Sequence, residues 1–518
     1  MPVGRRTTRG RLSRRCFLAA VGALGMASAG AAAHGNGYTM PTLLFADSAT
    51  QRRLGALHAT ALTALADSHT IHADPAVYDR AGLLTRPPGT LVRAGGGYPS
   101  PQRWTRDAAV NAWNGVSLLA PAVGRNTLWS VVDQSPNGLV VQQDNQWWDQ
   151  VVWIPAAWHH YRITGDRDFL GRAFETSVNT LSTRRARDFD AAHGLFRGPG
   201  FMNDGISGCP SPPASASVHS SFVLDHPGTE ALMSLSTNSL YHGALSALAS
   251  MAESLGEPQR AVSLRADATR LREAVDRHLW REQAGTYAYF VRPDGHVDTS
   301  QEGAGLALAL LFQVADRRRA NLVLDTAHWQ PHGIVNVWPH FPRFDDHRPG
   351  RHNVMVWPMV HGLYGNAAAD TGRADLFARC VEQLAALVTR SDKNFFELYD
   401  SVSGAVDGGW QEGGSGRPEH FVSQPDQAWS ATAYLRLIHD GLFGLAFSED
   451  TLRFRPCLPP HWGAVSLRGL RYRGATLDIT LRGSGSRVRA CTVDGRSAEP
   501  VVPAATTGHH TVDLVLGV

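Results

Sequence analysis

The sequence predicts a mainly α-helical fold, an (α/α)6 toroid with a small C-terminal antiparallel β domain. Helical apolar periodicity recurs in eleven segments between residues 107 and 445, against twelve helices in an ideal ring of six hairpins. The segments are separated by alternately long and short connections. In three of the helix pairs, Gly165, Gly256 and Gly372 are expected to end the first helix in a tight turn before the second begins. From about residue 451 the apolar pattern becomes that of strands. Closed into a ring, such hairpins would line a central pocket with the loops at one end.

The N-terminal 33 residues are predicted to be a signal peptide rather than part of the fold. Ser13 to Leu18 forms a twin-arginine pattern, an apolar run extends from Phe17 to Ala29, and small residues follow up to Ala33. The apolar run is too short for a bilayer span, so no membrane anchor is expected after cleavage. The expected location is periplasmic or extracellular, reached by the twin-arginine route.

The remaining chain divides into three predicted parts. Residues 34–100 form an N-terminal extension with one amphipathic stretch at 48–66, residues 101–450 form the catalytic barrel, and residues 451–518 form the β domain. The barrel helices are expected at 107–120, 125–133, 146–163, 167–183, 237–255, 258–278, 301–314, 317–327, 354–369, 373–389 and 427–445. The strands are expected at 452–455, 475–482, 487–492 and 511–516.

The composition describes a folded globular protein without a nucleic-acid signature. Hydrophobic residues make up 43% and charged residues 18% of the chain. The formal net charge is only +3, and arginines within the first 33 residues inflate it, so charge gives no case for nucleic acid. No metal-binding spacing or nucleotide-binding motif is found, and no cofactor or metal is expected. Whether Cys457 and Cys491 form a disulfide stays open.

Two long loops interrupt the succession of predicted helices, and each contains a candidate catalytic carboxylate. Loop 184–236 contains Asp204 among glycines, and loop 391–426 contains Glu397 among aromatic residues. Asp204 before a glycine also suits a simple turn, and Glu397 also suits a solvated loop. Loops of this length inside a compact domain are usually functional or disordered. Paired carboxylates are what glycosidic bond cleavage requires, one as acid and one as base.

Further candidates for substrate binding begin or flank predicted helices. Their alternative roles are helix capping for the acidic residues and core packing for the tryptophans. Aromatic faces in such positions can stack on sugar rings, and we expect Trp410, in a Gly-rich loop, to cover a sugar bound over Glu397 in an exo-acting pocket. The candidates are Trp104, Arg106, Asp107, Trp147, Trp148, Asp149, His352, Asn353, Trp357, Trp410, Gln427 and Trp429.

These segments together resemble bacterial six-hairpin glycoside hydrolases, the group that includes processing α-glucosidases, trehalases and mannosylglycerate hydrolases. The segment Trp104-Thr-Arg-Asp107 is similar to the substrate segment at the first barrel helix of that group. Phe201-Met-Asn-Asp-Gly205 is similar to the segment with the general acid, and Phe396 to Gly404 is similar to the segment with the base. Gln427-Ala-Trp-Ser-Ala431 matches the tryptophan segment of the last helix.

The resemblance implies an inverting glycoside hydrolase in which Asp204 is the acid and Glu397 the base. It implies an oligosaccharide or glycoside partner, with exo-acting cleavage of an α-linked oligosaccharide as the expected activity. The Pro-Gly-Gly-Arg-Phe signature of trehalases is absent, which argues against trehalose. Two alternatives stay open: a glycoside phosphorylase on the same fold, suggested by His352-Asn353, and a non-catalytic sugar-binding protein.

Overall fold

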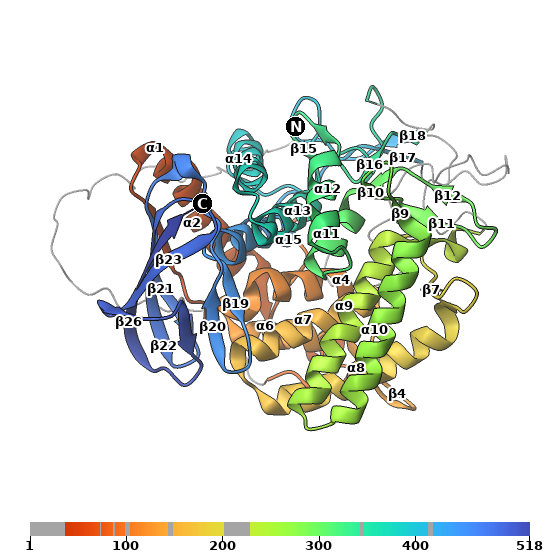
Figure 1. The fold of residues 1–518 in the computed structure, drawn as a ribbon, viewed down its shortest axis with the longest axis horizontal. Coiled ribbons are helices and arrows are strands. Elements are labelled where there is room, and N and C mark those ends of the chain that lie inside the picture. The colour runs from red at the N-terminus through yellow and green to blue at the C-terminus, as the bar shows by residue number, and fades with distance from the viewer. Residues whose placement is uncertain are drawn as a thin grey trace, which may run out of the picture.

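The computed structural model describes residues 37–517 except for residue 73 and segments 86–88, 99–103, 143–148, 201–227, 342–345 and 413–417. Within these ranges a helical ring occupies most of the molecule, and a β domain packs against one side of it (Figure 1). Among the helices that the structure describes, none combines the length and the apolar character needed to cross a membrane.

Six inner helices form a closed ring. Each contacts the next along the chain, and the last returns to contact the first. Inner helices are buried all round, as α11 shows, in which every residue from Gly303 to Leu310 is buried. The inner helices are α4 (Thr105–Asn111), α7 (Asp149–Thr164), α9 (Leu235–Ser254), α11 (Gly303–Leu311), α13 (Pro358–Thr371) and α15 (Ala428–Arg436). Helix α4 continues through η3 (Ala112–Val116) and α5 (Ser117–Leu119), and α15 continues through η7 (Leu437–Leu442).

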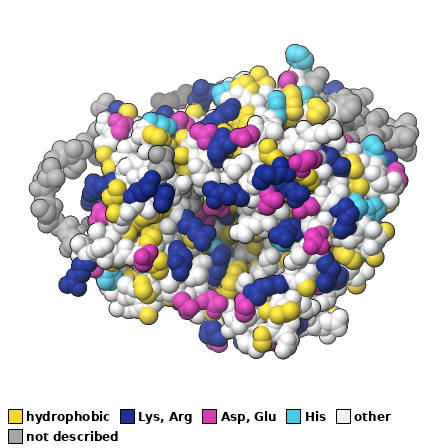
Figure 2. All heavy atoms as spheres, viewed as in Figure 1, with side chains coloured by type: hydrophobic (Ala, Val, Ile, Leu, Met, Phe, Trp, Pro, Cys, Tyr) yellow, Lys and Arg dark blue, Asp and Glu magenta, His cyan; other side chains and the backbone are white. Residues whose placement is uncertain are grey.

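Outer helices cover this ring and present one polar face to solvent. The helices α6 (Pro121–Trp129), α8 (Arg167–Asp188), α10 (Pro258–Leu279), α12 (Arg317–Thr326) and α14 (Ala374–Arg390) alternate with the inner helices along the chain. Arginine and acidic side chains are interspersed over the viewed face (Figure 2), with ion pairs such as Arg265–Glu253 and Arg373–Asp325. The predicted stops Gly165, Gly256 and Gly372 all have left-handed backbone, with φ of 72°, 79° and 82°.

The sixth outer helix comes from the predicted N-terminal extension. It runs through α1 (Ser48–Thr50), η1 (Gln51–Gly55), α2 (Ala56–Thr63) and η2 (Ala64–His69). Helix α2 packs against α15, and the Tyr434 hydroxyl of α15 donates a hydrogen bond of 2.9 Å to the Leu54 carbonyl. The ring of paired helices is therefore confirmed, but it begins before residue 101, where we placed the barrel boundary.

The C-terminal part forms two sheets. The larger has the order β1-β21-β22-β26-β23-β24, and its β1 (Thr42–Phe45) again comes from the N-terminal segment. All its neighbours are antiparallel except β22 and β26, which pair in parallel, so the predicted antiparallel domain holds one parallel pair. The strands are β21 (Val465–Tyr472), β22 (Ala475–Gly483), β23 (Arg487–Val493), β24 (Arg496–Ser497) and β26 (Gly508–Gly517), with a second sheet of β19 (Leu445–Phe447), β20 (Thr451–Phe454) and β25 (Val501–Pro503).

Short strands in the loops between helices complete the fold. Strands β15 to β18 lie near one another at one edge of the ring (Figure 1). These strands belong to three two-stranded sheets. The pairs are β13 (Gln301–Glu302) with β16 (Val337–Trp338), β14 (Trp329–Gln330) with β15 (Gly333–Ile334), and β17 (Trp410–Glu412) with β18 (Pro418–His420). Four further pairs are β2 (Thr70–His72) with β3 (Thr90–Val92), β4 (Val132–Ser135) with β5 (Gly138–Val141), β6 (Phe189–Asp190) with β7 (Leu195–Phe196), and β9 (Trp280–Arg281) with β10 (Thr286–Tyr287). A three-stranded sheet has β11 (Phe290–Val291) between β8 (Met233–Ser234) and β12 (Val297–Asp298). The short helices are α3 (Pro75–Tyr78), η6 (Thr229–Ala231) and η8 (Pro460–Trp462).

The cysteines within the described ranges are reduced. Cys380, Cys457 and Cys491 are free and buried, so Cys457 and Cys491 do not form a disulfide. Cys209 lies outside the described residues.

Candidate active site

The candidate site lies where the N-terminal ends of inner helices meet. The residues that precede or begin α4, α13 and α15 contact one another through Trp104, Trp357, Gln427 and Trp429. The free N–H groups and the helix dipole make such ends electropositive, which favours a carboxylate nearby.

Glu397 is held there by backbone pairing on both sides of its segment. The Glu397 N–H donates to the Gln424 carbonyl at 2.9 Å, next to α15. Two residues later, Tyr399 and Val356 exchange backbone hydrogen bonds of 2.8 and 3.0 Å, next to α13. The segment therefore lies between the entries to two inner helices, which fixes the direction of the Glu397 side chain.

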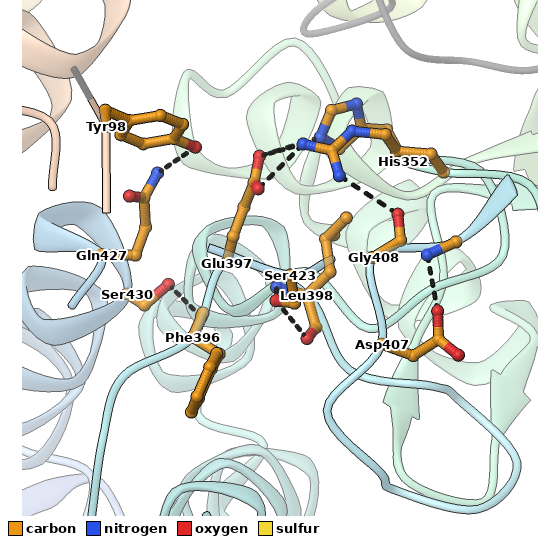
Figure 3. A network of polar contacts seen from close by, with 12 residues as sticks. Tyr98, His352, Phe396, Glu397, Leu398, Asp407, Gly408, Ser423, Gln427 and Ser430 are labelled. Atoms are coloured by element: carbon orange, nitrogen blue, oxygen red, sulfur yellow. Dashed lines mark hydrogen bonds and ion pairs between the residues drawn. The ribbon is translucent and has the colours of Figure 1, made fainter. Parts of the chain in front are cut away.

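The Glu397 carboxylate is buried and ion-paired (Figure 3). It is 3% exposed, and the Arg351 Nη2 lies 3.1 Å from its Oε1 and 2.9 Å from its Oε2. The His352 Nε2 lies 3.2 Å from Oε1. Burial raises the pKa of Glu397, but the Arg351 charge and the His352 contact outweigh it and lower the pKa to about 2. The carboxylate is therefore ionised at neutral pH and can accept a proton.

Two tryptophan side chains pack in series against the ring of His352. The His352 ring stacks on Trp357 with centroids 4.5 Å apart, and Trp357 meets Trp429 edge to face at 5.5 Å. His352 itself has a left-handed backbone, with φ of 58°, which is uncommon outside glycine and often found at functional sites. Trp357 and Trp429 are 2% and 3% exposed, so a sugar could stack on Trp357 only if these neighbours moved.

Tyr98 connects this cluster to the start of α4. Its hydroxyl lies 3.3 Å from the Gln427 amide (Figure 3), and its ring meets Trp104 edge to face at 4.8 Å. The amide orientation that satisfies both Gln427 atoms has the oxygen accepting from the Trp429 indole N–H at 2.8 Å and the nitrogen donating to the Ala94 carbonyl at 3.2 Å. Burial, then the charges of Glu397 and Asp107, raise the pKa of Tyr98. Tyr98 thus lies within the field of both carboxylates.

The predicted residues of α4 form one contiguous group beside Tyr98. The Arg106 guanidinium lies 4.9 Å from the centre of the Trp104 ring, and its Nε lies 3.6 Å from the Asp107 Oδ2. Arg106 and Asp107 are buried, and Asp107 occupies the first turn of the helix, where the dipole favours a negative charge. The structure therefore brings Trp104, Arg106 and Asp107 together with Glu397 around Tyr98.

Other predicted site residues are placed differently or lie outside the description. Asn353 is buried, and its backbone carbonyl accepts from the Val337 N–H at 3.0 Å. The Trp410 ring stacks on His420 at 4.8 Å, so one of its faces is covered. Asp204, Trp147 and Trp148 lie outside the described residues, and Asp149 begins α7 with its side chain outside the description. Their proposed roles stay predictions.

Arg351 and Tyr98 are the site residues that sequence reasoning missed. Arg351 immediately precedes the predicted His352, but nothing in the pattern links it to Glu397, which follows 46 residues later. Tyr98 follows three glycines, and a side chain on Gly95 would begin 2.5 Å from the Gln427 side chain. A glycine run before an aromatic residue is thus a signal of close backbone approach that could have been read.

Glu302 has a structural role at the same end of the ring. It is fully buried at the start of α11 and accepts a hydrogen bond of 2.8 Å from the Ser236 backbone N–H, in the first turn of α9. Its other oxygen accepts from the Ser236 hydroxyl. Glu302 therefore caps a neighbouring inner helix. Within the described ranges no group of three or more His, Cys, Asp or Glu side chains could hold a metal ion.

The fold and the site define a six-hairpin glycosidase-type enzyme. Residues 100–430 match the family described as the mannosylglycerate hydrolase MGH1-like glycoside hydrolase domain, and residues 445–500 match the C-terminal domain of glycosyl hydrolase family 65. The first match covers well over half of the chain, so this protein belongs to the MGH1-like glycoside hydrolase family.

Individual relatives are distant and longer. An N,N'-diacetylchitobiose phosphorylase of Vibrio furnissii is 22% identical over 304 residues, covering 54% of this chain and 37% of the relative. A solved structure described as a sialidase matches with a TM-score of 0.64 at 15% identity, over 90% of this chain and 40% of the other. A GH78 family rhamnosidase of Bacillus sp. GL1 matches with a TM-score of 0.53 at 14% identity, over 92% and 44%. The chain thus spans less than half of each, and the likenesses show the fold alone.

Proposed function

We propose that this protein is an exported inverting glycoside hydrolase in which Glu397 is the general base and Asp204 the general acid. The observation that carries the proposal is the buried, ionised Glu397 carboxylate at the meeting point of α4, α13 and α15. Its neighbours Tyr98, Arg106 and Asp107 offer hydroxyl, guanidinium and carboxylate groups of the kind that bind sugar hydroxyls.

The geometry of Glu397 suits proton transfer from water. Its Oε1 accepts from both Arg351 and His352, and its Oε2 accepts from Arg351. A carboxylate oxygen carries two lone pairs, so Oε2 can also accept a hydrogen bond from water. As the water oxygen bonds to the anomeric carbon, its proton passes to Glu397 and the bond to the leaving oxygen breaks. Asp204 gives its proton to that oxygen, and inversion requires the two carboxyl groups ~6.5–9.5 Å apart.

The substrate class follows from the family and not from the described side chains. We propose an exo-acting site for an α-linked oligosaccharide, because the sequence resembles the α-glucosidase and mannosylglycerate hydrolase group and because Trp410 is expected to cover a sugar bound over Glu397. The twin-arginine pattern at Arg14 and Arg15 supports export to the periplasm or the medium.

Phosphorolysis is the second candidate, and one observation favours it. The Arg351 guanidinium and the His352 ring are adjacent hydrogen-bond donors that could hold phosphate, and a phosphorylase is among the relatives. In this structure, however, Glu397 already accepts from both groups, so a phosphate dianion at that place would lie against a buried carboxylate. Like charges in such a site repel strongly, which favours hydrolysis.

A screen of α- and β-linked disaccharides, with and without inorganic phosphate, tests the proposal. Hydrolysis without phosphate, lost in Glu397→Gln, is expected. Products that appear only with phosphate, as sugar phosphate, would establish the phosphorylase instead. Saturable binding of a sugar with turnover of none would establish the non-catalytic alternative.

A further inference from the structure

We propose that Arg351 is a positioning residue, which residues 407–412 and 418–421 of the loop and β17–β18 hairpin hold in place so that it orients the Glu397 carboxylate. The inference deepens the proposed function, because it assigns a partner to the proposed base. It concerns Arg351 and the hairpin rather than any group that touches the substrate.

Backbone hydrogen bonds join the Arg351 segment to strand β17. The Arg351 N–H donates to the Trp410 carbonyl at 2.9 Å, and the Trp410 N–H donates to the Pro349 carbonyl at 2.7 Å. Gly409 has φ of 72°, and a side chain on it would begin 2.8 Å from the Arg351 N and Cα. The loop and residue 351 are therefore in close backbone contact, and a glycine is required there.

The Arg351 guanidinium is held by the same hairpin. Its Nη1 donates to the Gly408 carbonyl at 3.2 Å, and its Cζ lies 5.2 Å from the centre of the Phe421 ring. The Phe421 N–H in turn donates to the Gly409 carbonyl at 2.9 Å. With one nitrogen on a carbonyl and its face near a ring, the guanidinium has little freedom, and its Nη2 lies within 3.1 Å of both Glu397 oxygens.

The charged and titratable groups that face Glu397 come from two neighbouring segments. Arg351 and His352 precede α13 and contact the Glu397 carboxylate, and Tyr98 lies in the loop before α4, within the field of the Glu397 charge. Arg106 and Asp107 act on Tyr98 from α4. Among these, Arg351 provides two of the three polar contacts that the Glu397 side chain makes within the described residues.

The consequence is a competition between burial and charge at Glu397. Burial raises the pKa of this carboxyl, and Arg351 is the first of the causes that lower it. An opposite charge at this distance typically lowers a carboxyl pKa by ~1–3 units. Removing it should let burial dominate, so that Glu397 begins to protonate in the weakly acidic range.

Carbon-13 NMR of protein labelled at the glutamate carboxyl tests this without any substrate. The Glu397 resonance is assigned from its loss in Glu397→Gln. In the parent protein it should not titrate above pH ~3, whereas in Arg351→Gln its midpoint should rise by ~1–3 units. Arg351→Lys, which keeps the charge, should restore most of the low midpoint, and Gly409→Ala should raise it by less than Arg351→Gln.

Arg379→Gln is the matched control, because Arg379 also lies over an aromatic ring, 4.2 Å from the centre of Trp329, but on the outer helix α14. It should leave the Glu397 midpoint unchanged. An unchanged midpoint in folded Arg351→Gln would overturn the inference. The NMR result is independent of turnover, so a protein that cleaves no glycoside yet shows the shift would refute the proposed function and retain the role of Arg351.

Discussion

Two arginine–carboxylate pairs occupy opposite ends of the ring, and the pKa values of their carboxyl groups shift in opposite directions. Glu397 and Arg351 lie at the N-terminal ends of the inner helices, and the pKa of Glu397 is lowered to about 2. Asp440 and Arg436 lie 3.3 Å apart in the continuation of α15, and the pKa of Asp440 is raised to about 7. Burial raises both pKa values, and only at Glu397 do the Arg351 charge and the His352 hydrogen bond outweigh it.

The contacts explain the difference. Both Glu397 oxygens accept from Arg351, and His352 adds a further contact. Asp440 meets Arg436 through Oδ2, while Arg436 also bonds the Asn114 side chain at 3.3 Å and lies 4.1 Å from the centre of the Trp113 ring. The nearby Asp370 charge also opposes ionisation of Asp440. The Glu397 carboxylate thus keeps its charge because hydrogen bonds on both oxygens replace the lost water, whereas Asp440 has fewer such contacts and a like charge nearby.

The largest expected effect is a difference in activity between a substitution at Glu397 and one at Asp440, the carboxylates at the two ends of the ring. Glu397→Gln should lower kcat/KM by roughly 10²–10⁴-fold, the contribution usual for a general base. Asp440→Asn should change kcat/KM little, because it alters the end remote from Tyr98 and Trp104. Initial rates on the best glycoside from the screen measure both. An equal loss in both variants would show that the effect comes from the fold.

A second prediction uses the opposite pKa shifts. The Glu397 pKa is lowered from its ordinary value of 4.5, so the stability that it contributes is present above about pH 4.5 and is lost as pH falls toward 2. The Asp440 pKa is raised from 3.8, so its contribution is present below about pH 3.8 and is lost as pH rises through 7. Denaturant unfolding across this pH range should therefore show the advantage of the parent over Glu397→Gln growing with pH, and its advantage over Asp440→Asn shrinking. Parallel curves for parent and variants would contradict the account.

A third and smaller effect distinguishes the Trp410 side chain from its backbone. Trp410→Ala keeps the backbone bonds to Pro349 and Arg351 but removes the ring, one face of which lies on His420. Losing one stacking contact costs about 1 kcal/mol, so KM should rise about tenfold or less with kcat nearly unchanged. Steady-state kinetics measures the split. Parent-like KM would show that the ring does not touch the substrate.

The sequence predicts the ring well because inner and outer helices repeat one pattern. It predicts an amphipathic stretch at 48–66 but not its place in the ring, because a long connection separates that helix from α4 and hides its pairing with α15. The aromatic loop makes Glu397 a candidate, but no pattern indicates its ion pair with Arg351, since an ion pair between residues 46 positions apart has no periodicity. Tyr98 was missed because its place depends on a glycine run packing on Gln427.

The configuration of the first-formed product tests the central claim most directly. Proton NMR of the parent enzyme on an α-linked glycoside, read before mutarotation and in phosphate-free buffer, should show the β-anomer, with no signal from Glu397→Gln. Water attacking from the face opposite the leaving group produces this inversion when a separate base activates it. An α-anomer formed first would contradict the assignment of Glu397 as the base of an inverting hydrolase.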